Sequence, residues 1–138
     1  MSKHWDHIAG VIGFDPRRHE LGVADAERDY PQRAGVARRL DELCLLAPGW
    51  DGYQGRAVTA KTAARVHALL AACLSPAGRY PSIVPGSSGD VQVEWHRGGV
   101  DLEIGITEEE HVTFSFAYGD ADPEGISGTI ELKEPVTC

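Results

Sequence analysis

Apolar and polar residues alternate most clearly between residues 89 and 117, and this alternation predicts two consecutive β-hairpins. The apolar positions of the first hairpin are Val91, Val93, Trp95, Val100, Leu102, Ile104 and Ile106. Gly98-Gly99 separates its two strands. A two-residue glycine loop fixes the register of a hairpin, because glycine readily adopts the positive φ angles that tight turns require.

The expected register places five pairs of residues opposite one another. These pairs are Arg97–Val100, His96–Asp101, Trp95–Leu102, Glu94–Glu103 and Val93–Ile104. From Trp95 onward each apolar residue faces an apolar residue, so the register is consistent with one buried face. The second hairpin turns at residues 108–110, which places Ile104 opposite Phe114 and Leu102 opposite Phe116.

Helical periodicity appears in two stretches before the hairpins. Residues 31–46 begin with a proline suited to a first helical turn and place Val36, Leu40 and Leu43 on one face. Residues 60–74 follow Thr59, a good N-cap, and contain a continuous apolar stripe.

The order of these elements predicts an α+β fold. We expect a four-stranded antiparallel meander, ending in a strand near residues 126–132, with two helices packed on its apolar face. A fifth strand at residues 82–84 is left open, since the flanking prolines Pro81 and Pro85 restrict it to a sheet edge.

A single domain is expected over residues 31–133. Residues 1–30 give little pattern beyond a short strand at residues 11–14, and residues 134–138 are expected to form a loose tail. The three cysteines contain no C-x-x-C spacing, and their odd number argues against a disulfide framework. With no apolar run of membrane-spanning length and no leader pattern at the N-terminus, we expect a cytoplasmic protein.

Charge is distributed unevenly along the 138 residues, whose net charge is −8. Residues 1–85 hold eleven Lys/Arg and nine Asp/Glu, a net of +2, whereas residues 86–138 hold two and twelve, a net of −10. Direct binding of nucleic acid through the sheet is therefore disfavoured, because phosphates are bound by clustered Lys and Arg. A basic protein surface is the expected partner, although a merely solubilising acidic surface is an equal alternative.

The hairpin register gathers acidic side chains on the polar face of the sheet. This face would carry Glu94, His96, Asp101 and Glu103, and the turn beyond it Glu108, Glu109 and Glu110. Glu94 directly opposite Glu103 is destabilising, which suggests that the face is kept acidic for binding. The alternatives are acid/base chemistry by paired carboxylates and a divalent-cation site. We expect no catalytic residue and no cofactor, because an open sheet face excludes no water and no serine lies in a triad context.

One motif-like element precedes the second helix, the loop Gly49-Trp50-Asp51-Gly52. We expect Trp50 to be an apolar anchor between helices and sheet, Asp51 to bind backbone N–H groups, and the glycines to adopt positive φ.

With the proline-bounded segment 81–85 and the strand from Gly89 to Trp95, this loop resembles a loose group of small bacterial and phage-type proteins across residues 36–106. The group has no settled activity. The resemblance therefore implies the fold and a mobile-element or defence-related setting, and it carries no catalytic residues.

These observations favour a non-enzymatic protein-binding inhibitor of the antitoxin, immunity or anti-defence kind. It would present the acidic face and the turn at residues 108–110 to a basic, nucleic-acid-handling partner. One alternative is a small-molecule or divalent-metal-binding domain that uses the same face. Another is a module that self-associates through a sheet edge, for example as a homodimer.

Overall fold

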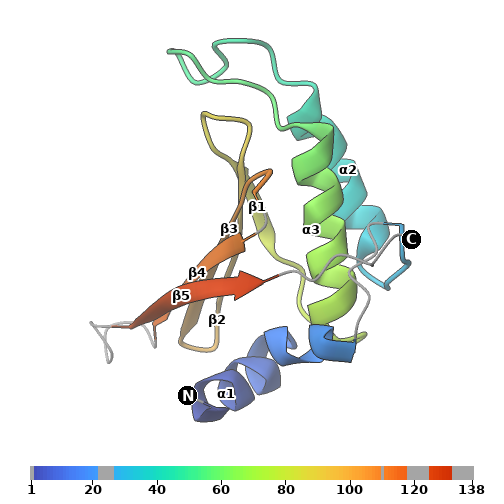
Figure 1. Ribbon diagram of the computed structural model, residues 1–138, viewed down its shortest axis with the longest axis vertical. Coiled ribbons are helices and arrows are strands. Elements are labelled where there is room, and N and C mark those ends of the chain that lie inside the picture. The colour runs from blue at the N-terminus through green and yellow to red at the C-terminus, as the bar shows by residue number, and fades with distance from the viewer. Residues whose placement is uncertain (1, 22–26, 110, 118–124, 132–138) are drawn as a thin grey trace.

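The computed structural model describes residues 2–21, 27–109, 111–117 and 125–131 (Figure 1). Its helices are α1 (Ser2–Ile12), the 3-10 helix η1 (Pro16–Leu21), α2 (Arg33–Cys44) and α3 (Ala60–Cys73). Its strands are β1 (Ser82–Pro85), β2 (Val91–Arg97), β3 (Val100–Ile106), β4 (His111–Ala117) and β5 (Ile126–Glu131). The predicted α+β class is confirmed.

All strand pairs of the sheet are antiparallel, and the spatial order is β1-β2-β3-β4-β5. The segment left open at residues 82–84 is thus β1, the edge strand of a five-stranded sheet. Every predicted pair between β2 and β3 is observed, from Arg97–Val100 to Val93–Ile104. Gly98 and Gly99 have φ angles of 58° and 79°, which confirms the expected glycine turn.

The two predicted helices are present with small differences at their ends. Thr59 caps α3 as expected, since its side-chain oxygen accepts a hydrogen bond from the backbone N–H of Thr62 at 3.1 Å. Helix α2 covers Arg33–Cys44 rather than residues 31–46, because Gln32 holds the N-cap position and Leu45 already has a non-helical backbone.

The expectation of a short strand at residues 11–14 is wrong. Helix α1 extends to Ile12, and Phe14 forms only an isolated bridge with Leu74. Ile8 and Ile12 are four residues apart and both fully buried, as on the apolar face of a helix. Gly13, with a φ of 82°, ends α1 in a left-handed conformation and donates its N–H to the carbonyl of Ala9.

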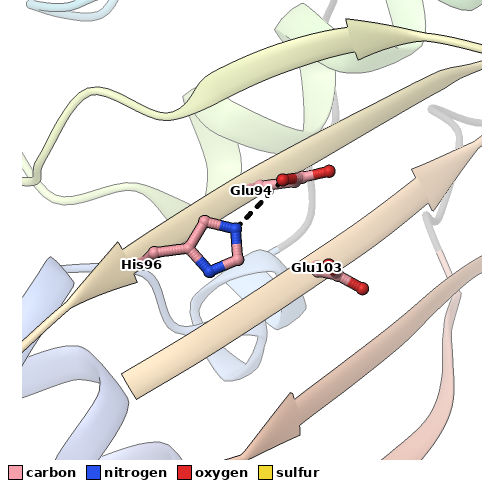
Figure 2. A group of neighbouring side chains, drawn as sticks. All are labelled: Glu94, His96 and Glu103. Atoms are coloured by element: carbon pink, nitrogen blue, oxygen red, sulfur yellow. Dashed lines mark hydrogen bonds and ion pairs between the residues drawn. The ribbon is translucent and has the colours of Figure 1, made fainter. Parts of the chain in front are cut away.

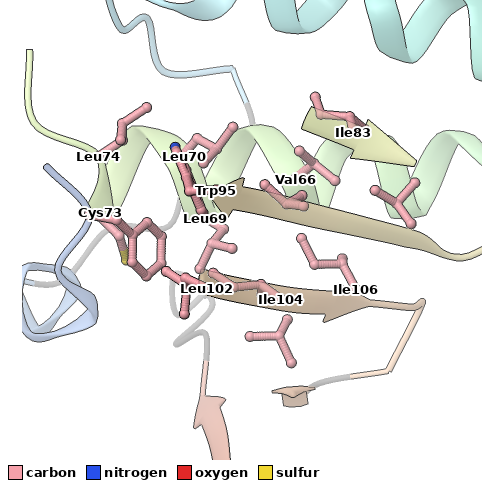
Figure 3. Packing of buried hydrophobic residues seen from close by; sticks show 14 of the residues in the cluster. Val66, Leu69, Leu70, Cys73, Leu74, Ile83, Trp95, Leu102, Ile104 and Ile106 are labelled. Carbon is pink, nitrogen blue, oxygen red and sulfur yellow. The ribbon is translucent and has the colours of Figure 1, made fainter. Parts of the chain in front are cut away.

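One hydrophobic core joins α1, α2, α3 and the five strands. Helix α3 lies along the sheet (Figure 1), and its Val66, Leu69 and Leu70 lie among inward-facing residues of the strands (Figure 3). Phe14 is completely buried, with its ring centroid 5.2 Å from that of Trp95 on β2 and 6.2 Å from that of Trp5 on α1. The segment that showed little pattern in the sequence therefore contributes large side chains to the core.

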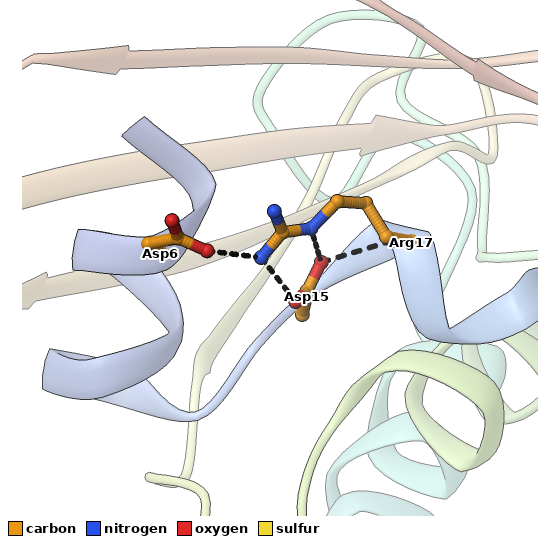
Figure 4. A network of polar contacts seen from close by, with 3 residues as sticks. All are labelled: Asp6, Asp15 and Arg17. Carbon is orange, nitrogen blue, oxygen red and sulfur yellow. Dashed lines mark hydrogen bonds and ion pairs between the residues drawn. The ribbon is translucent and has the colours of Figure 1, made fainter. Parts of the chain in front are cut away.

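Polar contacts connect α1 to η1 at the surface. The Arg17 guanidinium donates to Asp6 at 2.8 Å and to both carboxylate oxygens of Asp15 at 2.8 and 2.7 Å (Figure 4). Exposed ion pairs contribute about 0–1 kcal/mol each, so the packing of Ile8, Ile12 and Phe14 holds this segment more strongly than its charges do. Within the described part of the chain, no helix has the length and apolarity required to cross a bilayer.

Candidate functional site: the acidic sheet face

The polar face of β2 and β3 is produced by the alternation of their side chains. Val91, Val93 and Trp95 are buried in the hydrophobic core, so residues at the intervening positions point to the other side of the sheet. The solvent-facing side chains Glu94, His96, Asp101 and Glu103 are called the acidic face below. The register places Glu94 beside Glu103 and His96 beside Asp101, as predicted.

His96 bridges two carboxylates of the acidic face. Its Nε2 lies 3.0 Å from Glu94 Oε1, the contact drawn in Figure 2, and its Nδ1 lies 2.8 Å from Asp101 Oδ1. A carboxylate can only accept, and a neutral imidazole carries one N–H, so both hydrogen bonds form together only with the imidazolium. The positive ring then offsets part of the repulsion between Glu94 and Glu103.

The hydrogen bond to Glu94, followed by that to Asp101, raises the pKa of His96 above its ordinary value of 6.5. In the unfolded chain these partners are lost and the pKa returns to that value. The stabilisation is therefore complete at pH values below 6.5 and is lost as the pH rises through the folded-state pKa. Because the His96 side chain is 49% exposed, solvent weakens this contribution.

The arrangement is suited to binding cations of two kinds. One ligand atom from each of Glu94, His96 and Glu103 lies within 4.8 Å of the other two, close enough for a shared divalent ion. The side chain of Asp101 is 46% exposed, which leaves this carboxylate accessible to a partner's Arg or Lys.

Glu108 and Glu109, the described residues of the predicted hairpin turn, do not lie on the acidic face. Glu108 and Glu109 line an open depression of about 420 Å³ together with Thr62 and Asp90, next to the first turn of α3. Helix α3 packs on the buried side of the sheet, so the turn belongs to a different surface from Glu94. Glu110 lies outside the described residues.

The loop Gly49-Trp50-Asp51-Gly52 closes on itself. Asp51 Oδ1 accepts the backbone N–H groups of Tyr53 and Gly55, each at 2.9 Å, and Gly49 and Gly52 have φ angles of 77° and 85°. The expectations for Asp51 and for the glycines are confirmed. Trp50 donates from Nε1 to the carbonyl of Arg56 at 2.8 Å and is only half-buried. It is not among the described core residues, so the expectation that it anchors the helices to the sheet is wrong.

A second open depression, which sequence reasoning missed, lies beside this loop. Its volume is about 840 Å³, and Arg56 donates from Nη2 to the carbonyl of Ser88 at its wall. The remaining lining residues are Asp51, Tyr53, Gln54 and Ser87. Residues 56 and 88 meet through a single parallel bridge, and no local pattern in the sequence indicates that pairing.

Comparison with protein-family models, with curated proteins and with solved structures finds no match for this chain.

Proposed function

We propose that the protein is a non-enzymatic inhibitor of the antitoxin, immunity or anti-defence kind, whose acidic face binds a basic surface on a nucleic-acid-handling protein. The observation that carries this proposal is the partly exposed pair Glu94–Glu103 on the polar face, with Asp101 beside it. Like charges directly opposite each other lower the stability of the fold. A bound basic side chain would relieve this repulsion between the carboxylates, and the relief would add to the affinity for the partner.

Inhibition would follow from competition for the same side chains. Arginine and lysine residues that bind phosphates also bind carboxylates, and an arginine can do so through two parallel hydrogen bonds. A partner whose basic groove is occupied by the acidic face cannot hold nucleic acid there. The net charge of −10 on residues 86–138 would steer the encounter and make it sensitive to salt.

The first experiment is a pull-down with the tagged full chain from lysate of its native host, eluted by a salt step. We expect a nucleic-acid-binding protein in the eluate. Glu94→Lys and Asp101→Lys should each weaken its binding by about tenfold or more, because a charge reversal replaces an attractive contact with a repulsive one.

Glu42→Lys is the matched control, because it makes the same charge change at an exposed position of α2. It should leave affinity nearly unchanged, and circular dichroism should show the same fold for all three variants. Binding that persists at high salt and tolerates Glu94→Lys would contradict the proposal.

A divalent-cation site is a second candidate, favoured by the convergence of Glu94, His96 and Glu103. Two carboxylates and one imidazole match the donors preferred by Zn²⁺ and related ions. The two candidates differ in the effect of Zn²⁺ on the apparent pKa of His96, because a metal binds only the deprotonated ring nitrogen.

We expect NMR titration of the His96 ring to give a pKa above 6.5, and Glu94→Gln to lower it by removing the largest cause of the shift. Glu109→Gln is the control, since it makes the same chemical change in the hairpin turn, away from this ring. A cation site requires Zn²⁺ to lower the apparent pKa of His96, whereas docking alone leaves it unchanged. An unshifted pKa in the wild-type chain would contradict the bridged geometry.

A further inference from the structure

The two edges of the sheet differ in how they are protected. At the β1 edge, Arg39 on α2 donates from Nε to the carbonyl of Ile83 at 3.0 Å, and prolines stand at positions 81 and 85. Proline offers no N–H, and a charged side chain on an edge carbonyl obstructs an incoming strand. The β1 edge is thereby closed to further pairing.

Within residues 126–131, the described part of the β5 edge, no such device is present. Residues 126–131 contain neither proline nor lysine, and no strand in the described part of the chain pairs with the outer side of β5. Ser127, Gly128 and Thr129 are exposed. An edge strand with these properties is a template for another strand.

The sequence of β5 is symmetric by residue type about Gly128, since it runs Ile-Ser-Gly-Thr-Ile from 126 to 130. When two antiparallel copies of a strand are related by a two-fold axis at one residue, positions equally far from that residue pair with each other. Centred on Gly128, this rule places Ser127 opposite Thr129 and Ile126 opposite Ile130 in both halves. Hydroxyl residues then lie opposite hydroxyl residues on both sides of Gly128, and such cross-strand pairs are favourable.

The distribution of charge on the sheet also permits two copies to pair at the β5 edge. Among the side chains that the structure describes on the polar face next to this edge, the exposed ones are hydroxyls, namely Thr113, Ser115, Ser127 and Thr129; Glu131, at the end of β5, is paired in register with His111. The carboxylates of the acidic face stand on β2 and β3, farther from the edge. Two copies joined at β5 therefore do not bring their acidic faces into direct opposition.

We infer that the chain forms a two-fold homodimer in which the β5 strands of two copies pair antiparallel, centred on Gly128. The partner is a second copy of this chain, and the inference is independent of the proposed function. A two-fold axis perpendicular to the sheet keeps both acidic faces on the same side. The dimer thus presents two such faces on one continuous ten-stranded surface.

The test is the mass of the full chain in solution, measured by analytical ultracentrifugation over a range of concentrations. We expect twice the mass of one chain at high concentration. The double variant Ser127→Lys/Thr129→Lys should raise the dimer dissociation constant by about tenfold or more, because the register places an introduced lysine opposite another at two sites. The variant Ser127→Lys/Thr129→Glu should restore the dimer, because each lysine then meets a glutamate.

The variant Thr113→Lys/Ser115→Lys controls for added charge, since both positions are exposed on β4, one strand away from the edge. It should leave the dissociation constant nearly unchanged, and thermal unfolding identifies any variant that fails to fold. A wild-type chain that stays monomeric up to its solubility limit would overturn the inference. So would equal weakening by the lysine–lysine and lysine–glutamate variants, because the register predicts opposite effects for them.

Discussion

Replacing Phe14 with alanine is expected to lower the free energy of unfolding by about 3–5 kcal/mol. The side chain is completely buried between Trp5 and Trp95, so its loss leaves a cavity that rigid neighbouring rings cannot readily fill. It also removes the ring contact between Phe14 and Trp95 on β2. Urea unfolding followed by circular dichroism measures the change.

Tyr53→Ala is the matched control for this truncation. Tyr53 is also aromatic, but its exposed fraction is 86%, so its removal should change stability by no more than about 0.5 kcal/mol. A loss below about 1 kcal/mol for Phe14→Ala would show that Phe14 does not pack as described.

Gly13→Ala is expected to cost about 2–4 kcal/mol, from two sources that add. The φ angle of 82° is unfavourable for any residue with a Cβ. That Cβ would lie 2.6 Å from the Cα of Gly78 and 2.7 Å from Ser75 Oγ, so the turn after α3 would have to move. The same unfolding measurement tests this prediction.

Gly10→Ala provides the control within the same helix. A Cβ at Gly10 meets nothing within 4 Å, and the residue lies inside α1. Alanine is favoured over glycine inside a helix by about 1 kcal/mol, so this variant should be slightly more stable than the wild type. Equal losses for the two variants would mean that general disturbance of α1, rather than the left-handed turn at Gly13, causes the effect.

The sequence predicted the strands far better than the N-terminal helix. Register in β2 and β3 is determined locally, by a glycine turn and by apolar alternation over seven residues in each strand. Helix α1 is short and contains Gly10, and its apolar face becomes evident only when Ile8 and Ile12 are buried by distant parts of the chain. Local propensity is a weak guide where tertiary packing determines the structure.

In the candidate site, too, local features could be predicted from the sequence and tertiary features could not. The register alone predicted which residues of the acidic face are neighbours, because cross-strand neighbours are fixed once the turn is known. The register did not predict that Glu108 lies on a different surface, because the position of Glu108 depends on how the hairpin end lies against α3. The depression at Arg56 and Ser88 depends on a contact between residues 32 positions apart, which alternation and periodicity cannot detect.

The packing of α1 also determines the order in which the chain can complete its fold. Trp5 lies 5.1 Å from the ring of Phe114 and 6.2 Å from that of Phe116, both on β4. During synthesis α1 leaves the ribosome before these partners, which lie more than 100 residues further along the chain. The apolar side of α1 therefore lacks these contacts until β4 has been synthesised. The strands of the β-meander pair with their sequence neighbours, so the sheet can form before α1 docks on it.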